Sequence, residues 1–571
     1  MSKPPFHRLT LAGLLFLFFA LPSSLGEDVY SNAVVATDHP AASQAGLQML
    51  KQGGTAVDAA VASSFALSVV RPASCGIGGG GFMVVWDAEL QQAIALDYRE
   101  SAPAAATRDM FATANGPESE SVRGGRAIGI PGTVAGLCYA AEYYGTLPLA
   151  TLLTPAIRLA TDGVEIDEHD QAIQRQVLKT IRRHSGYSKQ YAALVDLYLN
   201  DGIPWKSGNR FHSPQLPVLR LIAEHGPHAF YRGDVAKAIL RESVQRGGIL
   251  SAEDLTSYVP KVRNPITGQF REATVLSMPP PSSGGIALIQ MLQALEQWEA
   301  QTQSSLKDLK HNSDEYIHVI SEVAKHAFAD RSRFLGDSDF VRVPAKQLTS
   351  PAYAARTAAK IDRSQVQAAN SYGRYFNDDD SGTSHISIID GNGNAVSCTE
   401  TINLTFGSFV VVPEYGIVLN NEMDDFSARP GKPNAFGLLQ SKANSVDAGK
   451  KPLSSMTPTI AIRDGRAVFA SGASGGPRII SATLQVTLNH LVFNMTPQQA
   501  VSAPRFHHQW FPNVLNLESG FTDSVRNSLS QKGHRLKSIS AAGVNQAVSS
   551  NANGQLRGAS DPRKHGQPAG F

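Results

Sequence analysis

The stretch Asn377-Asp378-Asp379-Asp380-Ser381-Gly382-Thr383-Ser384-His385 decides the fold of this chain. Residues 362–382 are polar, which predicts an exposed and poorly packed segment that ends at Gly382. From Thr383 the pattern changes, because residues 385–389 alternate, Asp390-Gly391-Asn392-Gly393 has turn chemistry, and residues 394–402 resume a strand pattern. This change predicts a β-hairpin that begins directly after the polar segment.

The register of this hairpin depends on the length of its loop. A loop with an odd number of residues, 391–393 or 390–394, pairs Thr383 with Thr401, and both side chains then leave the same face. A four-residue loop places Glu400 opposite Thr383 instead. A threonine hydroxyl needs a base, and its own α-amino group can serve once the preceding peptide bond is broken. Thr383 is therefore a candidate nucleophile that cleavage after Gly382 would expose.

Composition bounds the class of protein. The chain has 571 residues, 42% of them hydrophobic, which suffices for a large core and exceeds one ordinary domain. Lys plus Arg number 51 against 49 Asp plus Glu, so electrostatics gives no case for binding nucleic acid or acidic membranes. We therefore expect small, neutral partners and no nucleic acid.

The N-terminus predicts export. Basic residues at Lys3, His7 and Arg8 precede an apolar run over residues 9–21, and Ser24-Leu25-Gly26 has the small residues of a cleavage site. An uncleaved membrane anchor is the alternative, but the run is shorter than the roughly 20 apolar residues that a span needs. We expect residues 1–26 to be a signal peptide and the protein to be secreted or periplasmic.

The cysteines and histidines show no sequence pattern of a metal site or of a thiol nucleophile. An odd number of cysteines cannot form a closed disulfide framework, so we expect three buried free thiols: Cys75, Cys138 and Cys398. A cysteine nucleophile is the alternative, but none of the three has a histidine nearby in a recognisable pattern. There is no HExxH motif, and three neighbouring histidines lack the i, i+4 spacing of helical zinc ligands: His311, His318 and His326. We predict no catalytic metal and no cofactor.

Periodicity predicts helices on both sides of a glycine-rich loop. Residues 41–52 and 57–70 have helical spacing with Thr55 as N-cap, and residues 151–333 are mainly helical, with one helix starting near Asn312 or Ser313. The loop Gly76–Gly81 feeds a strand over residues 82–86. A phosphate-binding loop would instead run from a strand through glycines to a helix, so close backbone packing beside a sheet is the favoured interpretation.

Long motifs in one order give the chain a family resemblance. It resembles the γ-glutamyltransferases (γ-glutamyl transpeptidases) of the N-terminal nucleophile hydrolase superfamily, and the resemblance runs nearly end to end. The motifs are Gly53-Gly54-Thr55-Ala56-Val57-Asp58-Ala59-Ala60, Gly76-Ile77-Gly78-Gly79-Gly80-Gly81-Phe82-Met83, Asp97-Tyr98-Arg99-Glu100-Ser101-Ala102-Pro103, Pro131-Gly132-Thr133-Val134-Ala135-Gly136-Leu137, Thr383-Ser384-His385, Asn420-Asn421-Glu422-Met423-Asp424-Asp425-Phe426-Ser427 and Pro452-Leu453-Ser454-Ser455-Met456-Thr457-Pro458-Thr459.

The resemblance implies an α+β fold, a four-layer αββα sandwich built jointly by two subunits. The precursor would cleave itself between Gly382 and Thr383, giving a large subunit, 27–382, and a small catalytic subunit, 383–571, that remain together as a heterodimer. No cofactor is implied.

The resemblance also assigns roles to individual residues. Thr383 would be the nucleophile, Thr401 its hydrogen-bond partner, and the backbone N–H groups of Gly475 and Gly476 the oxyanion hole. The carboxylate of a glutamyl headgroup would be held by Arg99, Ser454 and Ser455, and its ammonium by Asn403, Glu422 and Asp425. Without the resemblance, Arg99 would be a surface ion pair with Glu100 or Asp97, and Glu422 and Asp425 a solvated turn.

The implied activity is that of a γ-glutamyltransferase and glutathione hydrolase. It takes glutathione and other γ-glutamyl compounds as donors, and amino acids, peptides or water as acceptors. In bacterial members a tyrosine in the lid over the pocket often closes the site, whereas this chain has Phe436, which cannot donate that hydrogen bond. A related cephalosporin or glutaryl acylase of the same fold is the enzymatic alternative. An exported amino-acid-binding protein is the alternative from another class, but it would have no reason to split.

Overall fold

The computed structural model describes residues 28–112, 120–368, 371–372, 383–427 and 441–571. The expected signal peptide at 1–26, the cleavage-site residue Gly382 and the lid residue Phe436 lie outside the described residues.

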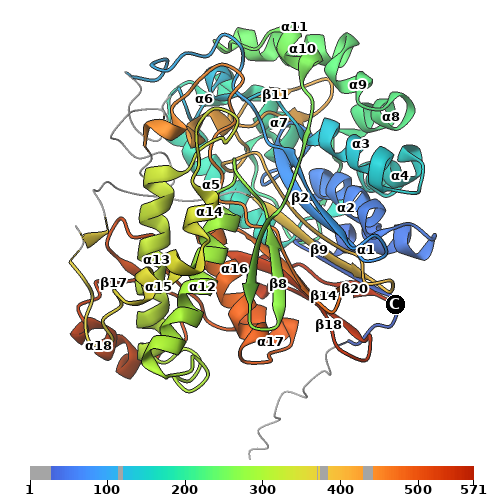
Figure 1. Ribbon diagram of the computed structural model, residues 1–571. Coiled ribbons are helices and arrows are strands. Elements are labelled where there is room, and N and C mark those ends of the chain that lie inside the picture. The colour runs from blue at the N-terminus through green and yellow to red at the C-terminus, as the bar shows by residue number, and fades with distance from the viewer. Residues whose placement is uncertain (1–27, 113–119, 369–370, 373–382, 428–440) are drawn as a thin grey trace, which may run out of the picture.

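Two antiparallel sheets form the centre of the molecule (Figure 1). The first sheet has the order β20 (Ala569–Gly570), β1 (Ala33–Thr37), β9 (Ser384–Asp390), β10 (Ala395–Thr401), β2 (Gly80–Asp87), β3 (Gln92–Tyr98) and β6 (Lys261–Arg263). The second sheet has the order β19 (Leu556–Ser560), β18 (Val544–Ser550), β14 (Arg466–Ser474), β13 (Thr459–Arg463), β8 (Ala273–Ser277) and β7 (Ile266–Phe270). Both sheets therefore combine strands from before and after position 383.

Helices cover the outer faces of the two sheets. On the first sheet lie α1 (Pro40–Lys51), α2 (Ala56–Val70) and α3 (Thr133–Tyr144), and α4 (Leu149–Asp162) packs on α2. On the second sheet lie α12 (Gly284–Thr302) and α16 (Arg478–Leu491), and α13 (Asp314–Phe334) packs on α12. Figure 1 shows the two groups of helices on opposite flanks of the strands. This order of layers confirms the predicted αββα sandwich.

The remaining elements surround this sandwich. The helices are α5 (Glu168–Arg183), α6 (Tyr187–Gln190), α7 (Ala192–Tyr198), α8 (Leu216–His225), α9 (His228–Tyr231), α10 (Gly233–Gln245), α11 (Ala252–Ser257), α14 (Ala345–Leu348), α15 (Pro351–Ala358), α17 (Pro497–Ser502) and α18 (Asp523–Gln531). The short strands are β4 (Val164–Glu165), β5 (Arg210–Phe211), β11 (Val411–Val412), β12 (Ile417–Val418), β15 (Phe506–His507), β16 (Leu515–Leu517) and β17 (Leu536–Ser538).

Local sequence signals set the helix starts as predicted. At the start of α2, the Asp58 backbone N–H donates to Thr55 Oγ1 at 3.2 Å, and Asp58 Oδ2 accepts from the Thr55 backbone N–H at 2.7 Å. This reciprocal capping box satisfies two donors that a helix start leaves free. Ser313 caps α13 with a single bond, because its hydroxyl accepts from the Tyr316 backbone N–H at 3.2 Å.

The region 151–333 departs from the mainly helical prediction at its centre. Residues 261–277 form β6, β7 and β8, which complete the far edges of both sheets. These strands are three to five residues long and owe their stability to pairing with distant strands such as β13, so local periodicity does not reveal them.

The glycine-rich loop packs closely, as favoured. A Cβ atom at Gly79 would overlap the carbonyl oxygen of Thr401, and one at Gly78 would overlap that of Val418. The glycines therefore let the start of β2 approach the end of β10, where the candidate nucleophile's partner lies.

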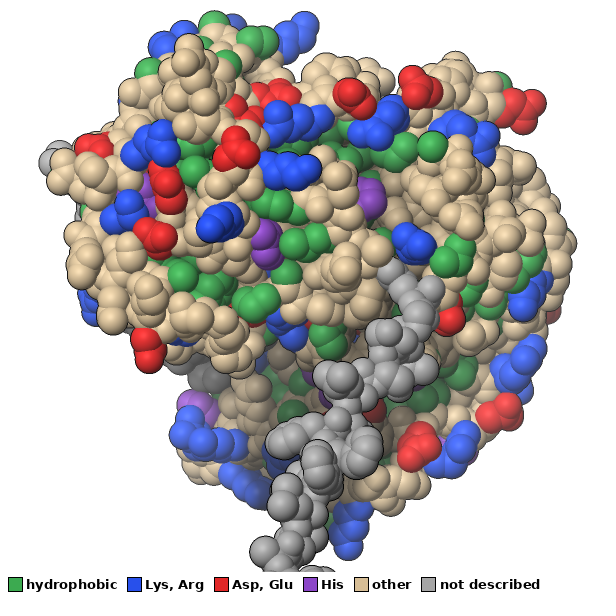
Figure 2. All heavy atoms as spheres, turned by 90° about the horizontal axis from the view of Figure 1, so that it is seen from below, with side chains coloured by type: hydrophobic (Ala, Val, Ile, Leu, Met, Phe, Trp, Pro, Cys, Tyr) green, Lys and Arg blue, Asp and Glu red, His purple; other side chains and the backbone are tan. Residues whose placement is uncertain are grey.

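The burial of the cysteines and the mixture of surface charges agree with what the composition predicts. All three cysteines are free and buried, which confirms that prediction. Among the described residues, no helix is both long enough and apolar enough to cross a membrane. Figure 2 shows Lys and Arg side chains interspersed with Asp and Glu over the face seen from below.

Candidate active site

The β9–β10 hairpin has the odd-loop register. Glu400 is the Cα partner of Ser384, Asp390 and Asn394 bracket a three-residue loop, and Thr383 therefore faces Thr401. The Thr383 Oγ1 hydroxyl donates to Thr401 Oγ1 at 3.3 Å. Glu400 points to the opposite face, where its carboxyl accepts from the Tyr98 hydroxyl at 3.1 Å. The prediction that Thr383 pairs with Thr401 is confirmed.

His385 shares the face of Thr383 but has other partners. Its Nδ1 lies 2.7 Å from Thr399 Oγ1 and its Nε2 lies 3.0 Å from Ser387 Oγ, between the two sheets. Burial lowers the pKa of His385 to about 3, so the ring is neutral at physiological pH. His385 therefore holds the sheets together, and the base for Thr383 must come from elsewhere.

Asn403 turns the chain just after Thr401. Its φ of 70° is in the left-handed region, and its backbone N–H donates to Thr401 Oγ1 at 2.8 Å. The Asn403 side-chain Nδ2 donates to the Asn421 carbonyl at 2.9 Å, whereas its Oδ1 is buried without a protein partner. A buried acceptor left unpaired in this way is costly unless a ligand donates to it.

A cavity gathers the residues that the sequence predicted. It spans about 290 Å³, part of it open to solvent, and its lining includes every expected site residue that the structure describes except Gly475. Its lining residues are Arg99, Thr383, Thr401, Asn403, Glu422, Asp425, Ser454, Ser455, Met456, Gly476, Pro477 and Ile479. Residues separated by hundreds of positions therefore meet around the Thr383 hydroxyl.

Arg99 is buried among carboxylates, so the surface ion-pair interpretation is wrong. Its side chain is 1% exposed, and Nη1 donates to Glu422 while Nη2 donates to Asp425 at 2.5 Å. Glu422 and Asp425 lie in a buried 3-10 turn, Glu422–Asp425, which also excludes the solvated-turn interpretation. The expected carboxylate and ammonium partners of a substrate therefore pair with each other in this structure.

Charge in this cavity is crowded and costly to desolvate. Burial raises the pKa of Glu422 well above its ordinary value and also raises that of Asp425, while Arg99 opposes both shifts. Burial raises the pKa of Glu100 to about 7, and both of its carboxyl oxygens lack a hydrogen-bond partner. Three carboxyl groups thus surround Arg99, and Arg331 also acts on Asp425, so the site holds charges of both signs out of water.

The two serines lie on a segment pinned by the turn before α12. The Ser454 backbone N–H donates to the Pro281 carbonyl at 2.9 Å, and the Ser283 backbone N–H donates to the Ser454 carbonyl at 2.8 Å. Ser454 Oγ accepts from the Met456 backbone N–H at 3.0 Å. These bonds hold both serine side chains at the wall of the cavity.

Gly475 and Gly476 join β14 to α16. Their φ values are 125° and 55°, a conformation that side chains disfavour, and Gly476 lines the cavity. The carbonyl groups of these glycines accept from the Arg478 and Ile479 backbone N–H groups at 3.1 Å each. The positive end of the α16 dipole therefore points toward the cavity.

A buried ion pair beside Thr383 was not found from the sequence. Lys564 Nζ donates to the Thr383 carbonyl at 2.9 Å and to Asp38 Oδ2 at 2.5 Å, and Gln546 Nε2 donates to Asp38 Oδ1 at 2.6 Å. These residues come from opposite ends of the chain. No motif or spacing connects them, so only the assembled sheets reveal that they fix the backbone of Thr383.

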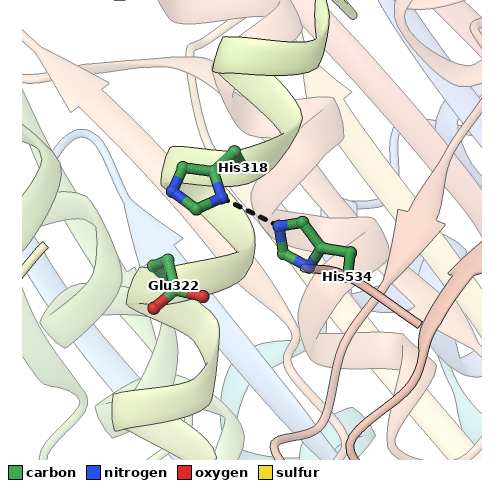
Figure 3. A group of neighbouring side chains, drawn as sticks. All are labelled: His318, Glu322 and His534. Carbon is green, nitrogen blue, oxygen red and sulfur yellow. Dashed lines mark hydrogen bonds between the residues drawn. The ribbon is translucent and has the colours of Figure 1, made fainter. Parts of the chain in front are cut away.

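A cluster of His318, Glu322 and His534 has metal-ligand residue types (Figure 3). The ring nitrogens His318 Nδ1 and His534 Nε2 are 2.8 Å apart. One Glu322 oxygen accepts from Lys325 Nζ at 2.6 Å and the other accepts from the Tyr372 hydroxyl. Because an ammonium group and a hydroxyl occupy both carboxylate oxygens, these contacts fit a hydrogen-bonded network better than a cation site.

Comparison with known proteins places the chain in a family. A family model described as gamma-glutamyltranspeptidase matches residues 42–571. The glutathione hydrolase proenzyme of Escherichia coli (strain K12) is 40% identical over 584 residues, covering 99% of this chain and 98% of the relative. Glutathione hydrolase 2 of Arabidopsis thaliana is 38% identical over 588 residues, covering 98% of each chain.

Solved structures share the fold. A cephalosporin acylase from Bacillus halodurans superposes with a TM-score of 0.83 at 27% identity, covering 98% of this chain and 99% of that chain. A γ-glutamyltranspeptidase chain from Helicobacter pylori has a TM-score of 0.53 at 37% identity, covering 59% of this chain and 93% of that chain. Family model, sequence relatives and fold agree across nearly the whole length, and this chain belongs to the γ-glutamyltranspeptidase family.

Proposed function

We propose that this protein is an exported γ-glutamyltransferase and glutathione hydrolase that matures by cleaving itself between Gly382 and Thr383. The observation that carries this proposal is the cavity in which the Thr383 hydroxyl faces Thr401 and lies beside the Arg99, Glu422 and Asp425 cluster. A hydroxyl nucleophile beside groups of both charges suits a donor whose headgroup is a zwitterion.

In the proposed maturation, Thr383 Oγ1 attacks the carbonyl carbon of Gly382. The peptide nitrogen leaves that carbon, which converts the amide into an ester and frees the Thr383 amine. Water then hydrolyses the ester and gives a carboxyl group on Gly382. Residues 27–382 and 383–571 remain associated as large and small subunits, because both sheets combine strands from the two segments.

In the proposed catalytic cycle, the freed amine accepts the Thr383 hydroxyl proton as Oγ1 attacks the γ-carbonyl carbon of the donor. The negative charge on the carbonyl oxygen is stabilised by the Gly475 and Gly476 backbone N–H groups. The amine returns the proton to the leaving nitrogen, which departs and leaves a γ-glutamyl ester on Thr383. An amino acid, a peptide or water then takes the acyl group.

The proposed headgroup clamp works by exchange of partners. A γ-glutamyl donor brings an α-carboxylate for Arg99 and an α-ammonium for Glu422 and Asp425, so each buried charge exchanges a protein partner for a substrate partner. The unpaired oxygens Asn403 Oδ1 and Glu422 Oε2 supply two acceptors for the ammonium. This exchange limits the desolvation cost of binding, because the site charges are already out of water.

The names of relatives support this proposal. The Escherichia coli relative is called a glutathione hydrolase proenzyme, and we propose glutathione as a donor here. The Helicobacter pylori chain covers a share of this sequence close to that of residues 27–382, which fits a two-subunit mature form. We also propose that residues 1–26 direct export. Phe436 is proposed to cover the pocket without donating the hydrogen bond of a lid tyrosine.

A glutaryl acylase is the second candidate, favoured by the superposition on the Bacillus halodurans cephalosporin acylase. A glutaryl group has the carboxylate but lacks the ammonium. When Arg99 turns to that carboxylate, no ammonium replaces it beside Asn403, Glu422 and Asp425, which makes the γ-glutamyl donor the better fit.

One assay tests class and acceptor together. Hydrolysis of γ-glutamyl-p-nitroanilide should be measurable, and addition of a dipeptide acceptor should increase the release of p-nitroaniline. Mature wild-type protein should run as two fragments on a denaturing gel, with Thr383 at the N-terminus of the smaller fragment. A Thr383→Ala variant that still splits at that bond would refute the mechanism.

A further inference from the structure

Arg331 is a buried cation behind the wall of the active-site cavity. It lies on α13, is 1% exposed, and forms no ion pair with a described carboxylate. Its Nε donates to Ser283 Oγ at 2.8 Å, its Nη2 donates to Ser455 Oγ at 3.3 Å, and its Nη1 is buried without a partner. A buried arginine without a carboxylate is costly, so its retention calls for an explanation.

The contacts of Arg331 fix the direction of the serine hydroxyls. A guanidinium can only donate, so Ser455 Oγ must accept from it, and the hydroxyl proton of Ser455 is left for another partner. Ser455 lines the cavity. Ser283 Oγ likewise accepts from Arg331 and donates to the Ser454 carbonyl at 2.6 Å, which ties Ser454 to the same cation.

Ser454 is oriented in the same sense. Its Oγ accepts from the Met456 backbone N–H at 3.0 Å, so its proton is also available to an acceptor in the cavity. Two hydroxyl donors beside each other suit the two oxygens of one carboxylate. Arg331 also adds positive charge near the cavity, whereas the charge of Arg99 is shared with Glu422 and Asp425.

We propose that Arg331 is a positioning residue that sets Ser455 and Ser454 as hydrogen-bond donors to the α-carboxylate of the donor substrate. The inference rests on the proposed function and extends it by one specificity-determining residue. Arg331 does not touch the substrate, and its effect passes through the serines and through its positive charge, which also acts on Asp425. It should therefore govern binding of the carboxylate and leave the reacting carbonyl unaffected.

The test compares two anilides that differ in this carboxylate. γ-Glutamyl-p-nitroanilide has the α-carboxylate and the ammonium, whereas 4-aminobutanoyl-p-nitroanilide has only the ammonium. In Arg331→Met we expect the KM for the first to rise about tenfold or more, with kcat changed less, as for loss of a hydrogen bond to a charged group. The kcat/KM for the second should stay within about twofold of the wild-type value.

A matched control and a cycle separate positioning from packing. Arg333→Met removes an exposed arginine from the same helix and should leave both substrates unaffected. In a Ser455→Ala background, Arg331→Met should raise the KM for γ-glutamyl-p-nitroanilide by a much smaller factor than in the wild type, because Arg331 acts through Ser455. An equal loss of kcat/KM on both anilides would overturn the inference. Fully additive effects of Arg331→Met and Ser455→Ala on KM would overturn it as well.

Recovery of the variants is checked by the two-fragment pattern on a gel. If Arg331→Met does not mature, Ser283→Ala takes its place, with the same expected loss confined to the carboxylate-bearing anilide, because it removes the hydroxyl that ties Ser454 to Arg331. An unchanged KM in Ser283→Ala would refute the role of Arg331. Failure of wild-type protein to act on γ-glutamyl-p-nitroanilide would instead refute the proposed function, so the two failures are distinguishable.

Discussion

The hydroxyl oxygens of Thr383 and Thr401 lie 3.3 Å apart on one face of the β9–β10 hairpin. Thr401 Oγ1 also accepts from the Asn403 backbone N–H at 2.8 Å. The backbone turn at Asn403 thus holds the Thr401 hydroxyl and also places Asn403 in the cavity. One turn therefore positions both the hydrogen-bond partner of the nucleophile and a residue of the headgroup site.

Removal of the Thr401 hydroxyl should impair the nucleophile. Thr401→Val keeps the shape but takes away the acceptor of the Thr383 hydroxyl, and we expect kcat to fall about tenfold or more. Thr401→Ser retains the hydroxyl and is the control. Initial rates with γ-glutamyl-p-nitroanilide and the rate of precursor splitting measure the effect, and a Thr401→Val enzyme with wild-type kcat would contradict it.

Asp425 should discriminate donors by their ammonium. Asp425→Asn removes a negative charge that is paired with Arg99. We expect kcat/KM for γ-glutamyl-p-nitroanilide to fall about tenfold or more, because the α-ammonium loses a charged partner. Glutaryl-p-nitroanilide lacks that ammonium, so its kcat/KM should fall less. The same loss on both anilides would favour the acylase alternative.

Donor affinity should depend on pH through the raised pKa values of the cavity carboxyl groups. Burial raises the pKa of Glu422 and that of Asp425, and it raises the pKa of Glu100 to about 7, so a rise in pH through neutrality deprotonates Glu100. The negative charge gained then attracts an ammonium and repels a carboxylate. The KM for γ-glutamyl-p-nitroanilide should fall between about pH 6 and pH 8, and that for glutaryl-p-nitroanilide should rise. Parallel profiles for the two anilides would rule out this assignment.

The Asp38–Lys564 pair should matter for stability as well as for the site. Both side chains are at most 5% exposed, and Lys564 Nζ also donates to the Thr383 carbonyl. Lys564→Met leaves Asp38 buried without its cation and should lower the free energy of unfolding by about 3–5 kcal/mol. Thermal unfolding of the purified variant measures this loss. Lys51→Met, which removes an exposed lysine, is the control.

Glu400 should make stability fall as pH rises. Burial raises its pKa to about 7 from an ordinary value of 4.5, so the folded state binds more protons than the unfolded state between these values. Stability therefore decreases through this window, by about 3 kcal/mol in total. Glu400→Gln removes the titrating group, and the difference in melting temperature between pH 5 and pH 8 should shrink. An unchanged pH dependence would show that Glu400 ionises normally.

The sequence by itself determined the hairpin, the helix start at Thr55 and a second helix start near Asn312 or Ser313, and it limited the residue opposite Thr383 to Thr401 or Glu400; the structure has the register with Thr401. These features follow from local rules, since turn length sets strand register and side-chain hydroxyls cap helices. The motifs also identified the family and the residues that gather around the cavity, because each motif is a contiguous run.

Only the tertiary structure decided the charge partners of those residues. Arg99 pairs with Glu422 and Asp425 from more than 300 positions away, which local sequence cannot show because burial and pairing arise when distant segments meet. The same holds for Lys564 beside Thr383 and for Arg331 behind Ser455. Strands β6 to β8 were likewise set by partners in the assembled sheets, since short strands gain their stability from cross-strand contacts.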